Sequence, residues 1–486
     1  MNRSGSDPSD TGAGSRGFGT AILRETLFYM AGVAGAALVA FLATPLYARS
    51  MGPEEYGRFA LALAAAAPLM AIARLGLDVA FSRYWFELKS PAARRDLTAS
   101  LLVFGALWCV VLTVLGAGAI VVGVGFFGLS RELALLFMVA LAALFPVQIF
   151  YHLQQVLRNQ FRPVPFAATS VGAALLGTGF GVLLVVGLGW KAAGALLGTV
   201  VVGLVGCLLT LPLVSQAVRG KVSWSAFYPL LKLGAPLVPA SLAFWIFTGF
   251  DKIVVADKTS DLGSYAVAAQ IALALSLVVT AIGQAWLPRV LKEEGANRDR
   301  VATVITFGSE ATLAILGSVA AVMGLAASWL VGIVGGPGFA KGAEALPLLA
   351  AANAFLGTSM ITVTGAILAK RTKRLPVITV VIGVIDIVLL LILVPLWGLV
   401  GAGVSLMVAY VLMTWLSLSY AQSVYPLPFR YGRLALLSLV VAGQAAFVAV
   451  RPGDPFGWAL ASLPVIWSIA LVLRLVRPRS SGSETE

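Results

Sequence analysis

The sequence predicts an all-α protein that crosses a membrane many times, with about 14 transmembrane helices in two six-helix lobes of a parallel repeat, plus two C-terminal helices. Three observations lead to this fold class. Of the 486 residues, 59% are hydrophobic and only 11% are charged, whereas an ordinary soluble domain is about 25% charged. Apolar stretches of spanning length recur along the whole chain, and basic residues gather in alternate loops.

The apolar stretches begin after a segment rich in Ser, Gly and Asp, residues 1–20, which we expect to be a disordered tail and not a signal peptide. The first stretch covers 21–47. The others lie near 58–80, 97–123, 132–156, 164–189, 192–217, 232–255, 262–288, 303–332, 343–369, 376–397, 400–423, 432–450 and 457–474. Each is long enough for a spanning helix of about 20 residues, which satisfies its own backbone polar groups.

Positive charge alternates between the two sets of loops. The loops on one side contain 25 of the 34 Lys and Arg residues, and those on the other side contain 7. By the positive-inside rule the richer side is cytoplasmic, so both termini are predicted to be cytoplasmic and the protein to lie in the inner (plasma) membrane. The net charge of +13 then follows from topology, and no nucleic-acid partner is expected.

An internal repeat relates the two halves of the chain. Residues 55–62 align with 261–268, and 190–195 align with 397–402 at nearly the same offset. Six helices separate the copies, so the halves should share one orientation, as in transporters whose repeats are related by an axis along the membrane normal. The predicted divisions are a tail at 1–20, an N-lobe at 21–217, a cytoplasmic linker at 218–231, a C-lobe at 232–424, helices 13 and 14 at 425–475, and a cytoplasmic tail at 476–486.

Four segments carry a family resemblance: residues 46–60, 231–239 together with Asp251 and Lys252, 263–266, and 335–349. They resemble the Wzx-type polysaccharide flippases of the multidrug/oligosaccharidyl-lipid/polysaccharide exporter superfamily. The resemblance implies export of a polyprenyl-diphosphate-linked oligosaccharide, for surface polysaccharide synthesis, by alternating access between two lobes. It also implies a lipid-linked glycan substrate and membrane lipids as partners, with a polysaccharide polymerase and glycosyltransferases as further candidates.

Charged residues at membrane depth are costly, so those that persist face protein or a watery cavity. Arg24 and Arg74 are candidates for binding the substrate diphosphate. For Arg24 the alternative is contact with lipid headgroups. For Arg74 the alternative is an ion pair with Asp78, four residues later on the same helix. Lys252 is a further substrate-binding candidate, and local pairing with Asp251 is its alternative.

Four acids are candidates for coupling transport to a proton or cation gradient, because a carboxyl group in low dielectric changes charge readily. They are Asp78, Asp251, Glu310 and Asp386. The alternative for each is permanent pairing or neutrality. No cofactor is expected, since Cys109, Cys207 and the single His152 are too far apart in sequence to suggest a metal set, and the Gly-rich run 116–128 lacks a nucleotide-binding motif.

Polar side chains cluster near the inner end of helix 4. Gln148 and His152, with Gln154 and Gln155, are candidates for a sugar-binding cavity, and bonding to neighbouring helices is the alternative. The same two interpretations, sugar binding or bonding to neighbouring helices, apply to Gln270, Gln284 and Asn353.

Three other functions were weighed. An integral-membrane glycosyltransferase, polymerase or ligase is disfavoured because every outer loop is short and poor in carboxylates, so no enzyme is expected. A multidrug exporter and a lipid II flippase share the architecture. The sequence favours the lipid-linked oligosaccharide flippase, with the lipid II flippase as first alternative and the drug exporter as second, because Arg24 and Arg74 suit an anionic substrate.

Overall fold

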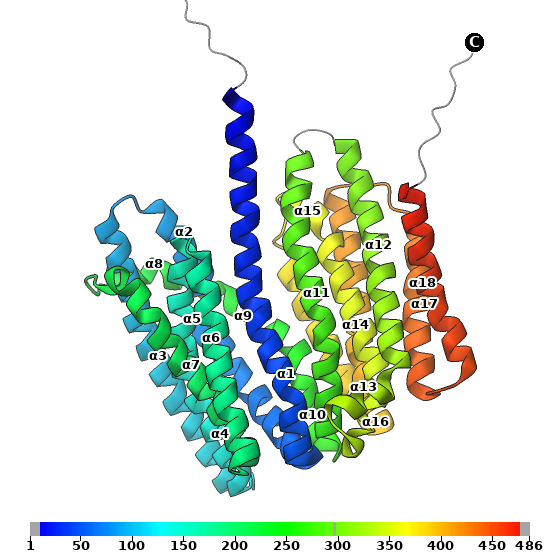
Figure 1. Ribbon diagram of the computed structural model, residues 1–486, viewed down its shortest axis with the longest axis horizontal. Coiled ribbons are helices and arrows are strands. Elements are labelled where there is room, and N and C mark those ends of the chain that lie inside the picture. Colours follow the sequence, from blue (N-terminus) through cyan, green and yellow to red (C-terminus); the bar gives the residue numbers. More distant parts are fainter. Residues whose placement is uncertain (1–9, 295–297, 477–486) are drawn as a thin grey trace, which may run out of the picture. The chain divides into compact units, whose positions relative to one another are not determined.

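The computed structural model describes the backbone of residues 10–294 and 298–476. Within its helices, the side chains of residues 10–26, of most residues from 277 to 300, of residue 472 and of those beyond 473 are not among those described. In the described part of the chain every regular element is a helix (Figure 1). This confirms the all-α membrane fold class.

Ten helices are long and apolar enough to span a membrane, and the described chain contains two shorter apolar helices, Leu262–Ser276 and Pro455–Leu471. Two of the ten contain a sharp kink. α1 (Asp10–Arg74), which begins within the predicted tail, bends at Gly52 with φ 77°, and α16 (Leu375–Val424) bends at Gly398 with φ 55°. Such positive φ values are readily adopted only by glycine. The kinks fall between consecutive predicted stretches, and the count of fourteen helices stays a prediction.

The chain divides into two compact units. Unit 1 comprises residues 1–43 and 69–238, and unit 2 comprises 44–68 and 239–486. Residues 44–68, in the middle of α1, therefore group with unit 2, although the repeat assigns them to the N-lobe. The division into lobes by repeat symmetry stays a prediction.

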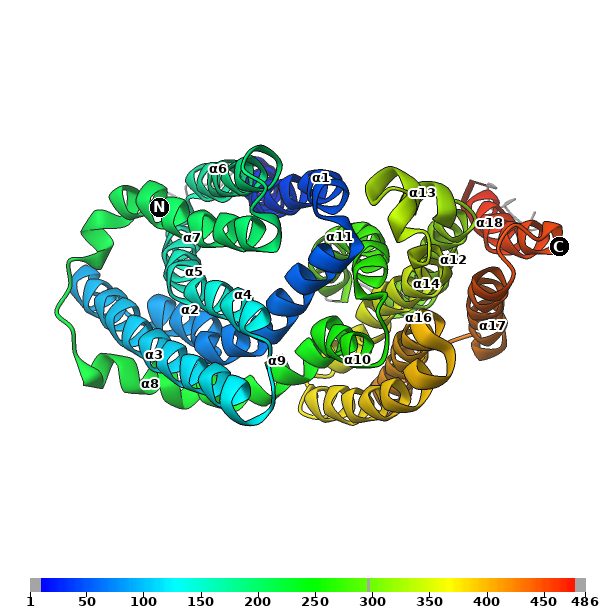
Figure 2. The same cartoon turned by 90° about the horizontal axis from the view of Figure 1, so that it is seen from below.

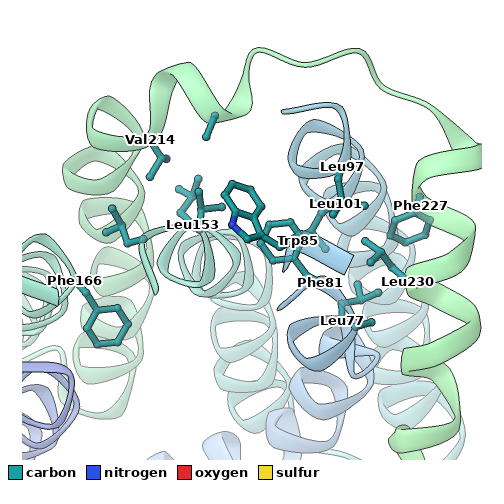
Figure 3. Close-up of a cluster of buried hydrophobic side chains, with 14 residues drawn as sticks. Leu77, Phe81, Trp85, Leu97, Leu101, Leu153, Phe166, Val214, Phe227 and Leu230 are labelled. Atoms are coloured by element: carbon teal, nitrogen blue, oxygen red, sulfur yellow. The ribbon is translucent and has the colours of Figure 1, made fainter. Parts of the chain in front are cut away.

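Unit 1 contains the first part of α1 and most of the helices of the first half of the chain. Their bounds are α2 (Leu77–Glu87), α3 (Pro91–Phe126), α4 (Arg131–Ala142), α5 (Leu144–Asn159), α6 (Pro163–Val182), η1 (Leu183–Gly187), α7 (Lys191–Val218), α8 (Trp224–Gly234) and η2 (Ala235–Leu237). Figure 3 shows the core of this unit, where Phe81 and Trp85 of α2 lie among apolar side chains of α3, α5 and α8. This core fixes α2 against its neighbours.

Close packing of α6 on α7 depends on small residues. A Cβ atom at Gly198 would lie 2.8 Å from Gly181 Cα, and one at Gly177 would overlap the backbone of Val202. Glycines permit this approach because they have no side chain, and small residues are common at helix interfaces in membranes.

Unit 2 is built around one buried helix. Its elements are α9 (Val238–Trp245), η3 (Ile246–Phe250), α10 (Asp251–Lys258), α11 (Leu262–Glu294), α12 (Arg298–Leu325), α13 (Ala327–Val334), η4 (Pro337–Phe339), α14 (Gly342–Thr362), α15 (Thr364–Leu368), α16, α17 (Tyr431–Val450) and α18 (Pro455–Val476). α14 packs on α11, α12 and α16, and Figure 2 shows it between α12 and α16. Its apolar window is 89% buried, so this helix is surrounded mainly by other helices of unit 2.

Candidate functional site

A break in the helix separates Arg74 from Asp78. α1 ends at Arg74, Leu75 and Gly76 have φ values of 47° and 60°, and α2 begins at Leu77. The prediction that Arg74 and Asp78 share one helical face is therefore wrong. In the described part of the chain the two side chains form no ion pair with each other.

The break is held in place by α8. A Cβ atom at Gly76 would lie 2.6 Å from the Gly234 carbonyl oxygen, and one at Gly234 would overlap the Leu75 carbonyl oxygen. Two glycines facing each other thus allow the backbones to touch. Glycine at position 76 also adopts the left-handed conformation without the steric cost that a Cβ atom would add. The contact is tertiary, so a sequence pattern within one helix does not reveal it.

Tyr151 of α5 joins the two charges. Its hydroxyl donates a hydrogen bond to Asp78 Oδ2 over 3.0 Å, and the Arg74 guanidinium carbon lies 4.7 Å from the centre of its ring. A cation over an aromatic face is attracted by about 0.5–2 kcal/mol. Asp78 and Tyr151 are half-buried and Arg74 is exposed. The structure thus brings Arg74 and Asp78 together through a residue that the sequence analysis did not select.

The polar residues of α5 extend this cluster. Gln155 donates to the Tyr151 hydroxyl over 3.3 Å, and Gln148 Nε2 lies 3.2 Å from His152 Nε2. Gln154 instead donates to Thr169 and Ser170 of α6, each over 3.0 Å. Gln154 therefore bonds to a neighbouring helix, which was the alternative to sugar binding. All four side chains are buried, and among the described residues His152 Nδ1, Gln154 Oε1 and Gln155 Oε1 have no hydrogen-bond partner.

A second cluster lies in unit 2 and contains two buried carboxylates. Asp251 of α10 accepts a hydrogen bond from the Tyr265 hydroxyl over 2.7 Å, and its Oδ1 lies 3.3 Å from Lys252 Nζ. Local pairing of Asp251 with Lys252 is therefore present. Tyr265 belongs to the segment 263–266, and Asp251 is grouped with the segment 231–239. Both segments carry the family resemblance, so this hydrogen bond joins residues of two resembling segments.

Asp386 lies on α16, which packs on α10. Its Oδ1 accepts a hydrogen bond from the Ser405 hydroxyl over 2.6 Å. Asp251 and Asp386 are 4% and 1% exposed. Both carboxylates are therefore shielded from solvent on two helices that pack against each other.

Glu310 of α12 is tied to the C-terminal helices. It forms an ion pair with Arg433 of α17 and accepts a hydrogen bond from Trp467 Nε1 of α18 over 2.8 Å. Pairing, the alternative to a coupling role for Glu310, is therefore present, and Arg433 is the partner. A cavity of about 400 Å³ adjoins the pair and is also lined by Phe307, Phe429 and Arg430.

Two candidates fall outside the described side chains, namely Arg24 and Gln284. Asn353 donates to the Leu349 carbonyl oxygen of its own helix over 2.9 Å. Among the residues whose side chains are described, no group of three or more His, Cys, Asp or Glu residues is placed to hold a metal ion.

The apolar helices of spanning length in the described chain define a polytopic membrane protein. More particularly, residues 22–292 match the family model described as polysaccharide biosynthesis protein, and the chain belongs to that family. It is 26% identical over 276 residues to "Lsg locus putative protein 1" of Haemophilus influenzae. This match covers 55% of the chain and 65% of that relative's length.

Two solved structures show the same fold. Lipid II flippase MurJ, in an inward closed conformation, superposes with a TM-score of 0.69 at 15% identity, covering 93% of this chain and all of that one. A mutant of the Vibrio cholerae MATE transporter VcmN gives a TM-score of 0.56 at 14% identity, covering 83% and 96%. Because both identities are low, these likenesses concern the fold alone.

Proposed function

We propose that this protein flips a polyprenyl-diphosphate-linked oligosaccharide from the cytoplasmic to the outer face of the inner membrane, by alternating access between two lobes, and that it is not an enzyme. Membership of the polysaccharide biosynthesis family and the transporter fold support this function.

The observation that carries the proposal is the state of Arg74. It is exposed in the last turn of α1, inside the predicted apolar stretch 58–80, it lies against an aromatic ring, and in the described structure no carboxylate neutralises it by direct pairing. An arginine at the centre of a spanning helix costs at least about 2.5 kcal/mol on insertion scales, so an arginine within an apolar stretch carries part of that cost. A substrate diphosphate would offset that cost through bidentate hydrogen bonds to the guanidinium group. Asp78, held by Tyr151, would keep the ring in place beneath it.

The other candidates take supporting roles in this proposal. Gln148 and His152 would bond to sugar hydroxyls after a change of conformation, since both are buried in the present one. Asp251 and Asp386 would couple the cycle to a proton or cation gradient. The prenyl tail would remain in lipid at a lateral opening, and the predicted cytoplasmic position of both termini sets the direction of export.

A lipid II flippase remains the second candidate, because Lipid II flippase MurJ superposes on nearly the whole chain. A lipid II flippase would also need the Arg74 cation beside the diphosphate of its substrate. A multidrug exporter is the third, and it is disfavoured because Arg74 would repel a cationic drug.

The test begins with deletion of the gene, followed by analysis of surface glycan and of the lipid-linked precursor on each face of the membrane. The expected result is lost polymer with precursor held inside. Intact polymer with arrested wall synthesis would support lipid II as the substrate, and drug sensitivity alone would support the exporter.

The site is tested by complementing the deletion with Arg74→Gln, with Arg74→Lys and with Arg131→Gln as a matched loss of charge elsewhere. Loss of one charge-assisted contact, worth about 1.5–3 kcal/mol, predicts export reduced by roughly 10- to 100-fold for Arg74→Gln. Arg74→Lys should recover part of it, and Arg131→Gln should export normally. Normal export by Arg74→Gln at equal protein level would refute the role of Arg74.

A further inference from the structure

Four basic residues gather in the short loop between α15 and α16. Lys370, Arg371, Lys373 and Arg374 line a cavity of about 520 Å³, together with Tyr420, Ser423 and Val424 from the end of α16. All of these residues belong to unit 2. The function proposed above makes no use of this cavity.

The loop has a defined conformation. The Lys370 amide donates to the Ile367 carbonyl oxygen over 2.9 Å, and the Arg371 amide donates to the Ala366 carbonyl oxygen over 3.0 Å. This is the pattern that ends a helix with a left-handed residue, a position usually occupied by glycine. Here it is Lys370, with φ 55°, so a charged side chain is retained where glycine would be less strained.

Tyr420 supports the loop from the other side of the cavity. Its hydroxyl donates to the Arg371 carbonyl oxygen over 2.8 Å, and the Arg374 guanidinium carbon lies 5.8 Å from the centre of its ring. Tyr420 therefore fixes the backbone of the loop and contacts the Arg374 side chain, and such preorganisation lowers the entropy cost of binding.

No carboxylate of the described residues compensates their charge. In the described structure none of the four forms an ion pair, whereas Arg58 pairs with Glu54 and Glu55. Four like charges around one cavity repel one another, and a multivalent anion would relieve that repulsion. Phosphate is the anion whose oxygens match such a set of donors.

An apolar stripe begins one turn after the cavity. Val377, Val381, Val384 and Val388 of α16 follow helical spacing, and each exposes about half of its side chain. In a bilayer this stripe faces acyl chains. A ligand with a phosphate in the cavity and a hydrocarbon chain along α16 would satisfy both surfaces.

We propose that the cavity formed by Lys370, Arg371, Lys373 and Arg374 binds the phosphate of an anionic phospholipid whose acyl chain lies along the exposed valines of α16. The lipid is a resident of the surrounding leaflet and is distinct from the transported molecule. By the predicted orientation this leaflet is cytoplasmic, where anionic headgroups attract basic segments.

The test uses the full chain purified in detergent, and the melting temperature is measured with added phosphatidylglycerol, phosphatidylcholine or inorganic phosphate. The variant is Arg371→Gln/Lys373→Gln/Arg374→Gln. The matched control, Lys89→Gln/Arg95→Gln/Lys221→Gln, removes three charges from loops of unit 1. Lys373→Gln alone serves if the triple variant does not fold.

We expect phosphatidylglycerol to stabilise the wild type and the control more than phosphatidylcholine does. At about 1 kcal/mol per basic residue near a membrane surface, the pocket variant should lose affinity on the order of 100-fold. Inorganic phosphate at equal concentration should have little effect. Equal protection of the pocket variant would overturn the proposal, and so would equal protection by inorganic phosphate, which would identify a site for soluble anions.

Discussion

The hydroxyl of Tyr265 donates a hydrogen bond to Asp251 Oδ2 over 2.7 Å, and the ring of Tyr265 is fully buried. The bond connects the start of α11 to the start of α10. A buried carboxylate with this donor and Lys252 at 3.3 Å is well satisfied, so the arrangement stabilises unit 2 whichever role Asp251 has in transport.

Tyr265→Phe should lower the free energy of unfolding by about 1–3 kcal/mol, because it removes a donor from a buried charged acceptor. Chemical denaturation in detergent measures the change. Tyr228→Phe, at an exposed tyrosine, is the control and should have little effect. An unchanged stability for Tyr265→Phe would show that Lys252 alone satisfies Asp251.

The two contacts of Tyr151 can be separated by substitution. Tyr151→Phe removes the hydrogen bond to Asp78 but keeps the ring beneath Arg74, whereas Tyr151→Leu removes both contacts. We therefore expect export to fall less for Phe than for Leu, by a factor of about 2–5 for a ring contact of roughly 0.5–1 kcal/mol. Glycan export at equal protein level is the measurement. Equal defects would mean that the ring does not position Arg74.

Asp386→Asn isolates the charge of Asp386. Asparagine Oδ1 can still accept the hydrogen bond from Ser405, so stability should change little. If Asp386 couples transport to a gradient, export driven by that gradient should fall at least about tenfold, which corresponds to roughly 1.4 kcal/mol. Ser405→Ala controls for loss of the bond. Full transport by Asp386→Asn would remove this residue from the mechanism.

Glu310 and Arg433 form a pair whose removal should be non-additive. Glu310→Gln leaves the partly buried Arg433 without its counter-ion and should cost about 1–3 kcal/mol of stability. The double variant Glu310→Gln/Arg433→Gln should recover part of this loss, as a double-mutant cycle would show. Should Glu310→Gln keep full stability but lose export, the residue would belong to the transport cycle and not to the docking of α17 and α18.

The fold class could be predicted from sequence because spanning helices require long apolar stretches, and the predicted stretches are largely helical, although 58–80 contains the break at Leu75 and Gly76. The relation between Arg74 and Asp78 could not. Helical spacing assumes a continuous helix, and the break at Gly76 depends on contact with Gly234, far along the chain.

The candidate clusters were predictable only in part. Asp251, Asp386 and Glu310 stand out as acids within apolar segments, but their partners lie on other helices. Tyr265 appears in a resembling motif, and this was the available signal for it. Tyr151 is adjacent to His152, in a segment that the sequence already marks as polar. Sequence spacing, however, does not identify the role of a tyrosine in an apolar helix.

α14 also bears on how the protein is made. The apolar window of α14 is 89% buried. This helix is also less apolar than α3 and α16, most of whose window residues are not buried. A helix that meets mainly other helices is selected for fit to its neighbours and not for affinity to lipid. During synthesis α14 is consequently a weaker signal for membrane insertion, so its stable integration should depend on α11 and α12, which precede it and pack on it.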